Sequence, residues 1–282
     1  MSNVLVTGGR GQLATCIGQV AHIDDDNRFI YTDYTDLNIT EEKEVERFFE
    51  DTNIQFCINC AAYTAVDQAE AEPKKADLVN HIGTRNLATA CKKHRATLIH
   101  ISTDFVFDGL QSLPYNEEAA TRPLGIYGAS KLAGETAIIE ILEQHYIIRT
   151  SWLYSNYGDN FMKTMLRLGQ ERDSLSVVCD QIGTPTYGID LARMVLNVLS
   201  NSTNMYGIYH YSNEGVASWY DFSKAIFDIS GVECHVTPIA GADFPTSAER
   251  PAFSVLDKTK VKRDFGIDIP YWRDSLKACL KK

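Results

Sequence analysis

A tyrosine and a lysine stand four positions apart in "IYGASK" (126–131), where a loop with Pro and Gly gives way to the helical pattern "KLAGETAIIEILE". If a helix has begun there, Tyr127 and Lys131 share one face, about one turn apart. A phenol ordinarily loses its proton near pH ~10, and a neighbouring ammonium favours the phenolate. The pair therefore predicts a tyrosine with a lowered pKa that donates a proton to a carbonyl under reduction. By itself the spacing also fits an ordinary helix surface.

Polar groups end the apolar stretch "LIHISTD", which closes with Thr103 and Asp104. In doubly wound sheets ligands collect at the carboxyl ends of strands, so we expect this end and the tyrosine helix to meet at one cleft. There Thr103 can hydrogen-bond a substrate carbonyl while Tyr127 delivers the proton, and Lys131 also holds the ribose of a nicotinamide cofactor. A strand-end threonine more commonly caps a turn. His100, inside the strand, is interpreted as a packing residue.

A glycine-rich turn follows the first apolar stretch in "NVLVTGGRGQLA". Gly8 and Gly11 allow a tight turn that brings backbone N–H groups close to a pyrophosphate at a helix N-terminus. Ala14 stands where a third glycine would ease helix–strand packing. A plain strand–turn–helix explains the glycines about equally well, but the position between a strand and a helix favours dinucleotide binding.

Acidic residues follow the second strand, at the place where a cofactor's adenosine is expected. Asp33 can accept hydrogen bonds from the ribose. Asp36 and Leu37 can border the adenine, although Asp36 is equally well a turn residue. Asp33 favours NAD whereas Arg10 can meet the 2′-phosphate of NADP, so both cofactors stay open. The nicotinamide is expected near "AAY" (61–63).

Apolar strands alternate with helices through the first half, in the strands "NVLVT", "RFIYTD", "FCINCAAY", "ATLIHISTD" and "YIIRTSW". Such strands indicate a parallel sheet covered on both faces. We predict an α/β fold: a Rossmann-like, doubly wound parallel sheet formed by 1–150, the NAD(P)-binding domain. Residues 151–282 are mainly a smaller C-terminal α/β substrate-binding domain, and the chain returns to the first domain around 188–213. One long helix is expected over 73–94.

Composition limits the class of protein. The 282 residues are 44% apolar and 23% charged, with a net charge of -10 that argues against a nucleic-acid surface. No apolar run is long enough to span a membrane, and no secretory signal is apparent. Seven scattered cysteines suit reduced thiols in a cytoplasm. No metal site is predicted.

The Gly-x-x-Gly turn, the strand-end Ser-Thr and Tyr-x-x-x-Lys, in this order, resemble the extended short-chain dehydrogenase/reductase superfamily. Further segments are similar to dTDP-4-dehydrorhamnose reductases and span almost the whole chain. They are "CAAYTAVDQAEAEP" (60–73), "ISTDFVFDG" (101–109), "IYGASKLAGE" (126–135), "RTSWLY" (149–154), "NFMKTMLRLG" (160–169), "DQIGTPT" (180–186) and "ERPAFSVLD" (249–257).

The resemblance implies reduction of the C4 ketone of dTDP-4-dehydro-L-rhamnose to dTDP-L-rhamnose by a hydride from NADPH, with NADH possible. The implied catalytic residues are Thr103, Tyr127 and Lys131, with Tyr127 the proton donor. Those implied to bind the cofactor are Gly11, Gln12, Leu13, Asp36, Leu37, Ala61, Ala62 and Tyr63, besides Gly8, Asp33, Tyr127 and Lys131. The implied sugar contacts are Thr103, Asp104, Tyr127 and Trp152. Asn160 and Arg250 are added because a diphosphate needs donors, and core packing is the alternative for Trp152.

The chain departs from the family pattern at one place, and two other functions remain as alternatives. Some members dimerise around a metal held by glutamates, one of them in the first helix, where this chain has Cys16. A monomer or a homodimer without metal is therefore expected. The regulatory beta subunit of methionine adenosyltransferase resembles this family and binds NADP, but the intact Thr103, Tyr127 and Lys131 favour catalysis. A sibling reductase of another dTDP-4-keto-6-deoxyhexose would differ in stereochemistry at C4.

Overall fold

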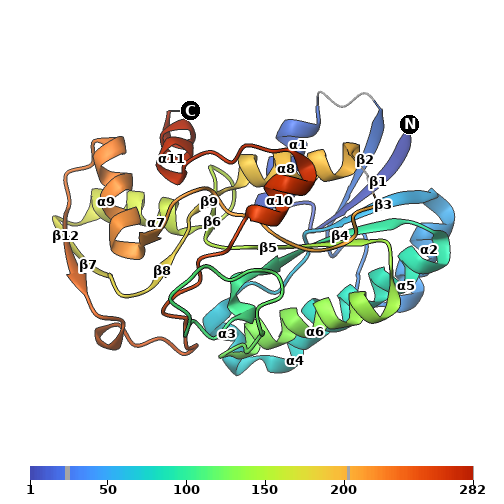
Figure 1. Cartoon of the computed structure of the whole chain (residues 1–282), viewed down its shortest axis with the longest axis horizontal. Coiled ribbons are helices and arrows are strands. Elements are labelled where there is room, and N and C mark those ends of the chain that lie inside the picture. Colours follow the sequence, from blue (N-terminus) through green and yellow to red (C-terminus); the bar gives the residue numbers. More distant parts are fainter. Residues whose placement is uncertain (23–25, 202–203, 282) are drawn as a thin grey trace.

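A six-stranded parallel sheet forms the centre of the computed structural model, which describes residues 1–22, 26–201 and 204–281 (Figure 1). Its strands are β1 (Ser2–Thr7), β2 (Asn27–Thr32), β3 (Ile54–Asn59), β4 (Thr97–Thr103), β5 (His145–Thr150) and β10 (Gly207–His210). They hydrogen-bond in the order β10-β5-β4-β3-β1-β2, and each neighbouring pair is parallel. The predicted α/β fold with a parallel sheet is confirmed.

Helices cover both faces of this sheet, because alternate side chains of a strand point to opposite faces. Val4 and Val6 of β1 join a core with α1 (Gln12–Ala21) and α8 (Gly188–Ser200). Leu5, between them, joins a second core on the other face. The helices of that face are α2 (Glu42–Thr52), α5 (Thr84–His94) and α6 (Ile126–Ile141), below the sheet in Figure 1.

The helix expected over 73–94 has an irregular middle. It consists of α4 (Pro73–Asp77), a π-helical segment η1 (Leu78–Gly83) and then α5. A wider π turn shifts the register of the side chains that follow, and such turns often lie at functional sites. Here the widened turn carries Asn80, which is fully buried and makes the contacts described below.

Most of the remaining chain builds short strands and helices beside the sheet, at the left of Figure 1. Three two-stranded pairs form: β6 (Leu153–Tyr154) with β9 (Thr186–Tyr187), β7 (Ser174–Val178) with β12 (His235–Ile239), and β8 (Ile182–Gly183) with β11 (Ala217–Ser218). The remaining elements are α3 (Val66–Ala71), η2 (Asp104–Val106), α7 (Phe161–Glu171), α9 (Trp219–Ser230), η3 (Gly241–Asp243), α10 (Thr259–Phe265) and α11 (Trp272–Leu280). Among these, α3 lies near α6 and α10 lies near β10.

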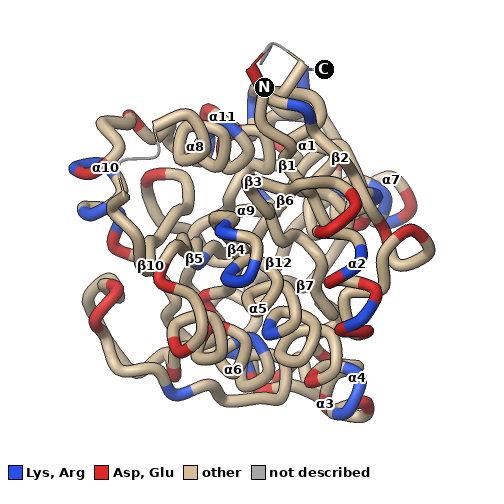
Figure 2. The backbone as a smooth tube through the Cα atoms, turned by 90° about the vertical axis from the view of Figure 1, so that its right-hand side faces the viewer, with Lys and Arg blue, Asp and Glu red and all other residues tan. Residues whose placement is uncertain are grey.

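Charged residues lie mainly on the outer helices and loops. Figure 2 shows acidic and basic positions mixed along these segments. Of the four inner strands, β1, β3 and β4 carry no Asp, Glu, Lys or Arg, as expected for strands covered on both faces. The fourth, β5, carries Arg149, whose buried charge is paired with Glu135. Among the described helices, none has the length and apolar character needed to cross a membrane.

Candidate active site

The start of α6 fixes the position of Tyr127. A carboxylate oxygen of Glu70, on α3, accepts a hydrogen bond from the Ile126 backbone N–H at 2.7 Å and so satisfies one open donor of the first helical turn. Gly128 lets this turn approach η2 closely, since a Cβ there would lie 2.2 Å from the Phe105 carbonyl oxygen. The tyrosine is thereby brought next to the end of β4, as the sequence predicts.

Thr103 lies at that strand end and is 5% exposed. Its hydroxyl donates to Asp104 Oδ1 at 3.2 Å and accepts from the Phe105 backbone N–H at 3.2 Å. The hydroxyl therefore caps the η2 turn, the commoner use of a strand-end threonine. It also lies beside the Tyr127 phenol, whose pKa it lowers.

The pKa of Tyr127 differs from the prediction. Burial of the hydroxyl raises the pKa to about 12; the Thr103 hydrogen bond lowers it, and the charge of Asp104 raises it again. The predicted drop towards neutrality is therefore wrong for this structure, because burial outweighs any stabilisation of the phenolate. The phenol is fully protonated near neutral pH, which is the state that a proton donor needs.

Lys131 lies one turn along α6 and is 1% exposed. Its Nζ donates to the Ile101 carbonyl oxygen at 2.7 Å and lies 3.1 Å from His100 Nε2. Burial lowers the pKa of Lys131 to about 8, against the charge of Glu135, which favours the ammonium. The amine is therefore held at the strand end, where the sequence places a group that binds the cofactor ribose.

Asp104 is a buried carboxyl, 2% exposed. Burial raises its pKa to about 6, while hydrogen bonds from Ser254 and Thr103 lower it. Within strict hydrogen-bond geometry its Oδ2 has no partner among the described residues. A buried polar atom without a partner is unusual and marks a place where a ligand hydroxyl can bind.

Asn80 is a site residue that the sequence analysis did not single out. Its Oδ1 accepts from the Tyr63 backbone N–H at 2.8 Å, and its Nδ2 donates to the Tyr63 carbonyl oxygen at 3.1 Å and to Ser130 Oγ at 3.0 Å. It thus clamps the "AAY" segment to α6. In the sequence, only the presence of an asparagine in the middle of an amphipathic helix indicated a special role. The direction in which its side chain points depends on the π turn.

The glycine turn has the shape of a pyrophosphate cradle. Gly8 has φ +64°, and a Cβ there would lie 2.9 Å from the Ala61 backbone, so β1 and β3 meet closely at this point. Gly11 is the N-cap of α1 and offers no side chain to satisfy the first N–H groups. These donors and the positive end of the helix suit an anion.

The adenosine end is open to solvent. Asp33 accepts from the Tyr34 backbone N–H at 2.8 Å, and one of its carboxylate oxygens lies 3.8 Å from Arg10 Nε. Asp36 accepts from the Asp33 backbone N–H at 3.0 Å, so it is a turn residue as well as a candidate adenine contact. Leu37, in contrast, is 4% exposed and belongs to the core that contains Leu5, so in this structure it packs inside the protein.

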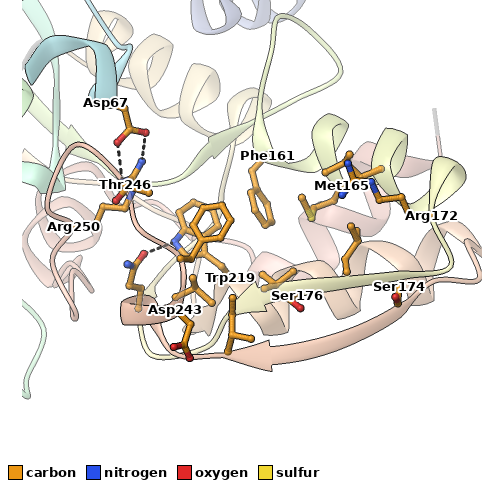
Figure 3. A pocket seen from close by; sticks show the side chains of 17 residues that line it. Asp67, Phe161, Met165, Arg172, Ser174, Ser176, Trp219, Asp243, Thr246 and Arg250 are labelled. Carbon is orange, nitrogen blue, oxygen red and sulfur yellow. Dashed lines mark hydrogen bonds and ion pairs between the residues drawn. The ribbon is translucent and has the colours of Figure 1, made fainter. Parts of the chain in front are cut away.

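A cavity of about 850 Å³ lies between α7, α9, β7 and the 243–250 loop (Figure 3). Phe161 and Trp219 form its aromatic middle. Arg250 and Asp67 stand at one end and Arg172 at the other. Thr103, Tyr127 and Lys131, the predicted catalytic residues, are not among its lining residues, so the cavity does not contain them.

Two structural connections link elements of the cavity to those of the predicted catalytic residues. Asp67 of its lining lies on α3, the short helix whose Glu70 holds the start of α6. Trp152, just beyond β5, stacks on Trp219 with ring centroids 3.5 Å apart and planes within 8°. Its φ of +45° is unusual for a tryptophan, and such strain often marks functional sites. Strand β5 ends beside β4, with Thr150 opposite Thr103.

The two proposed diphosphate contacts differ in position. Arg250 lines the cavity, where its guanidinium pairs with both carboxylate oxygens of Asp67. Asn160 is outside the lining residues. Its Oδ1 caps α7 by accepting from the Lys163 backbone N–H at 3.1 Å, and its Nδ2 donates to Gln12 Oε1 at 2.8 Å. Asn160 thus supports the start of α1, after the glycine turn, through Gln12.

Comparison with known proteins assigns the family. The model of the RmlD substrate-binding domain matches residues 1–282. This chain belongs to that family. A dTDP-4-dehydrorhamnose reductase of Aggregatibacter actinomycetemcomitans is 41% identical to it over 290 residues, 98% of each chain. A dTDP-4-dehydrorhamnose reductase structure from Clostridium acetobutylicum superposes with a TM-score of 0.96 at 40% identity, covering 99% of this chain and 98% of that one. A structure of the Bacillus anthracis reductase in complex with NADP has the same TM-score at 39% identity, covering 100% and 99%.

The cavity-lining aromatics of this RmlD-family chain were also missed from the sequence. Phe161 and Trp219 come from α7 and α9, and their rings are 4.6 Å apart by centroid. Trp219 Nε1 donates to Gln181 Oε1 at 3.2 Å. From the sequence alone each is interpreted as an ordinary core residue, because only the tertiary packing brings the two rings together.

Glu46, Glu50 and His94 form a group with metal-binding side chains among the described residues, on α2 and α5. Lys93 contacts both carboxylates, and His94 Nε2 lies 2.9 Å from Glu46 Oε1. Lys93 already pairs with both acids, so we interpret the group as a surface ion-pair cluster.

Proposed function

We propose that this chain reduces the C4 ketone of dTDP-4-dehydro-L-rhamnose to dTDP-L-rhamnose with NADPH. The observation that carries the proposal is the meeting of Thr103, Tyr127 and Lys131 at one strand end of the sheet that also carries the glycine turn. A cavity large enough for a nucleotide lies in the part of the chain beyond β5. NADPH, when bound, supplies the hydride. Relatives named dTDP-4-dehydrorhamnose reductase and a related structure containing NADP support both the substrate and the cofactor.

Tyr127 is the proposed proton donor. Because its pKa is about 12, the hydroxyl carries its proton near neutral pH and transfers it to the C4 oxygen as charge develops there. Thr103, beside the phenol, is proposed to hydrogen-bond the same oxygen and orient the ketone. Asp104 is proposed to bind a sugar hydroxyl through Oδ2.

The cofactor is proposed to bind along the sheet edge that includes the glycine turn. Gly8, Gly11, Gln12 and Leu13 provide the pyrophosphate turn, with Asp33, Asp36 and Leu37 at the adenosine and Ala61, Ala62 and Tyr63 at the nicotinamide. Lys131 is proposed to bind the nicotinamide ribose. Asn80 supports this wall through Tyr63.

The nucleotide of the substrate is proposed to occupy the cavity. Phe161 and Trp219 offer aromatic faces for a thymine ring, with Trp152 stacked behind Trp219. Arg250 offers a planar fork for the diphosphate at the end nearer α3. Residues 1–150 with 188–213 then form the cofactor-binding part, and the remainder of 151–282 is mainly the nucleotide-sugar part.

The test is an assay of the purified protein with enzymatically made dTDP-4-dehydro-L-rhamnose and NADPH. We expect loss of the reduced-nicotinamide absorbance and a product identified by NMR as dTDP-L-rhamnose. NADPH binding without turnover would contradict the proposal and favour a regulatory protein. A product epimeric at C4 would instead favour a sibling reductase.

A further inference from the structure

A buried row of polar side chains reaches Lys131 from the side of the sheet. Thr7, Asn59 and His100 are at most 1% exposed and lie at or near the ends of β1, β3 and β4. Thr7 Oγ1 donates to Asn59 Oδ1 at 2.7 Å, and Asn59 Nδ2 lies 3.0 Å from His100 Nδ1. The other ring nitrogen, Nε2, lies 3.1 Å from Lys131 Nζ. The proposed reaction gives no role to this row.

The orientation of the Asn59 amide follows from its neighbours. The Ala61 backbone N–H lies 3.2 Å from Oδ1 and can only donate. If the amide were turned over, Nδ2 would face that N–H and two donors would meet. The oxygen therefore faces Ala61, and the amide N–H₂ faces His100 Nδ1.

This orientation selects one tautomer of His100. Nδ1 accepts the hydrogen bond from Asn59, so in the neutral ring the proton is on Nε2. Burial and the nearby Lys131 hold the pKa of His100 well below its usual range, so the ring stays neutral. The Nε2–H then points at the lysine nitrogen. It can donate to a neutral amine, but it cannot accept from an ammonium.

We propose that His100, oriented by Asn59, is a positioning residue for Lys131 that holds the amine in one place and opposes its protonation. The Ile101 carbonyl oxygen accepts from the amine in either charge state and completes the placement at 2.7 Å. The charge that faces Lys131 acts in the opposite sense: Glu135, on the same helix, favours the ammonium. Cys60, after β3, is also near, but burial raises the pKa of its thiol and keeps it uncharged.

The proposal deepens the proposed function and rests on it for its effect on catalysis. A lysine whose ammonium is disfavoured loses its proton at lower pH than a free lysine, so activity that depends on the ammonium should fall on the basic side of neutrality. Tyr127 does not cause this loss of activity at basic pH, because its pKa is about 12. Asp104 does not cause it either, because its pKa is about 6.

The tautomer can be measured without any turnover. Nitrogen-15 NMR of the histidine rings, assigned for His100 among the seven histidines, distinguishes a protonated from an unprotonated nitrogen. We expect Nδ1 to be unprotonated and Nε2 to be protonated from about pH 6 to about pH 9, a range that begins near the usual pKa of histidine and extends above it. A proton on Nδ1 would overturn the proposal. Because this result needs no substrate, it stands apart from the proposed function.

The kinetic test uses His100→Gln, whose amide oxygen can accept from an ammonium. We expect the basic limb of the kcat–pH profile to move up by about one pH unit or more, with NADPH binding retained. His210→Gln is the matched control: His210 is equally buried in β10, but its ring contacts Arg149 and the Tyr115 carbonyl oxygen. An unmoved limb in His100→Gln, or an equal move in the control, would refute the proposal. Should His100→Gln fail to fold, the tautomer of the unchanged protein still decides.

Discussion

Arg250 and Asp67 form a two-point ion pair at the end of the cavity, with Nη2 2.7 Å from Oδ2 and Nη1 3.2 Å from Oδ1. The partners come from α3 and from the 243–250 loop, distant in sequence (Figure 3). The pair holds the pKa of Asp67 below its usual range. It also pre-orients the guanidinium, which lowers the entropy lost when an anion binds.

Arg250→Ala should weaken binding of the nucleotide sugar. A hydrogen bond to a charged group is worth about 1.5–3 kcal/mol, so KM for the dTDP-sugar should rise roughly 10- to 150-fold. KM for NADPH should stay the same. Steady-state kinetics with each substrate varied in turn measure both.

Arg167→Ala is the matched control, because Arg167 pairs with Glu171 on the exposed face of α7 and does not line the cavity. Equal effects of the two substitutions would argue against a diphosphate contact for Arg250. Arg250→Lys should restore little, since an ammonium lacks the planar fork.

Tyr127→Phe should remove most turnover and leave NADPH binding largely intact. General acid catalysis contributes ~10²–10⁴-fold, so kcat should fall by about that factor. Tyr154→Phe is a suitable control, because the Tyr154 hydroxyl is buried and has no hydrogen-bond partner among the described residues. Single-turnover kinetics and NADPH fluorescence titration separate the two effects. Near-normal kcat in Tyr127→Phe would exclude the proton-donor role.

The sheet was predictable from sequence because its strands are apolar on both faces and its turns are marked by glycine. The helix after the third strand was only partly predictable, since the amphipathic pattern continues through residues 78–83 although the backbone widens there. That widening aims Asn80 at Tyr63, and no local pattern encodes such a direction.

Catalytic residue types were predictable, whereas their electrostatics were not. Spacing placed Tyr127 and Lys131 on one face of α6, but whether the ammonium or burial decides the phenol's pKa depends on packing around both groups. His100 was expected to be a packing residue, and its contact with Lys131 depends on the register between β4 and α6. The cavity aromatics likewise depend on long-range packing.

Cofactor choice should respond to Asp33. Its carboxylate lies at the adenosine end, where it can accept from a ribose hydroxyl but repels a 2′-phosphate. Asp33→Asn should therefore raise kcat/KM with NADPH relative to NADH, and Arg10→Ala should lower the same ratio. A fewfold to tenfold change corresponds to about 1 kcal/mol. Kinetics with both cofactors measure the ratio, and identical ratios in all three proteins would place the 2′-position elsewhere.

Asp104→Asn should stabilise the fold while reducing activity. Burial raises the pKa of this carboxyl from 3.8 to about 6 in the folded chain, so folding favours its protonated form. Its contribution to stability is full below pH 3.8 and is lost as pH rises through about 6. At neutral pH the unchanged protein therefore keeps a disfavoured buried charge, worth at most about 3 kcal/mol.

The asparagine carries no charge at any of these pH values. The free energy of unfolding of the variant minus that of the unchanged protein should therefore increase from about pH 4 to about pH 6, the interval between the two pKa values of Asp104. Above this interval the difference should stay constant. Urea unfolding at several pH values measures this difference. A difference that does not change with pH would mean that Asp104 titrates normally. A variant with full kcat/KM would mean that Oδ2 does not bind the sugar, because an amide presents N–H donors where the carboxylate only accepts.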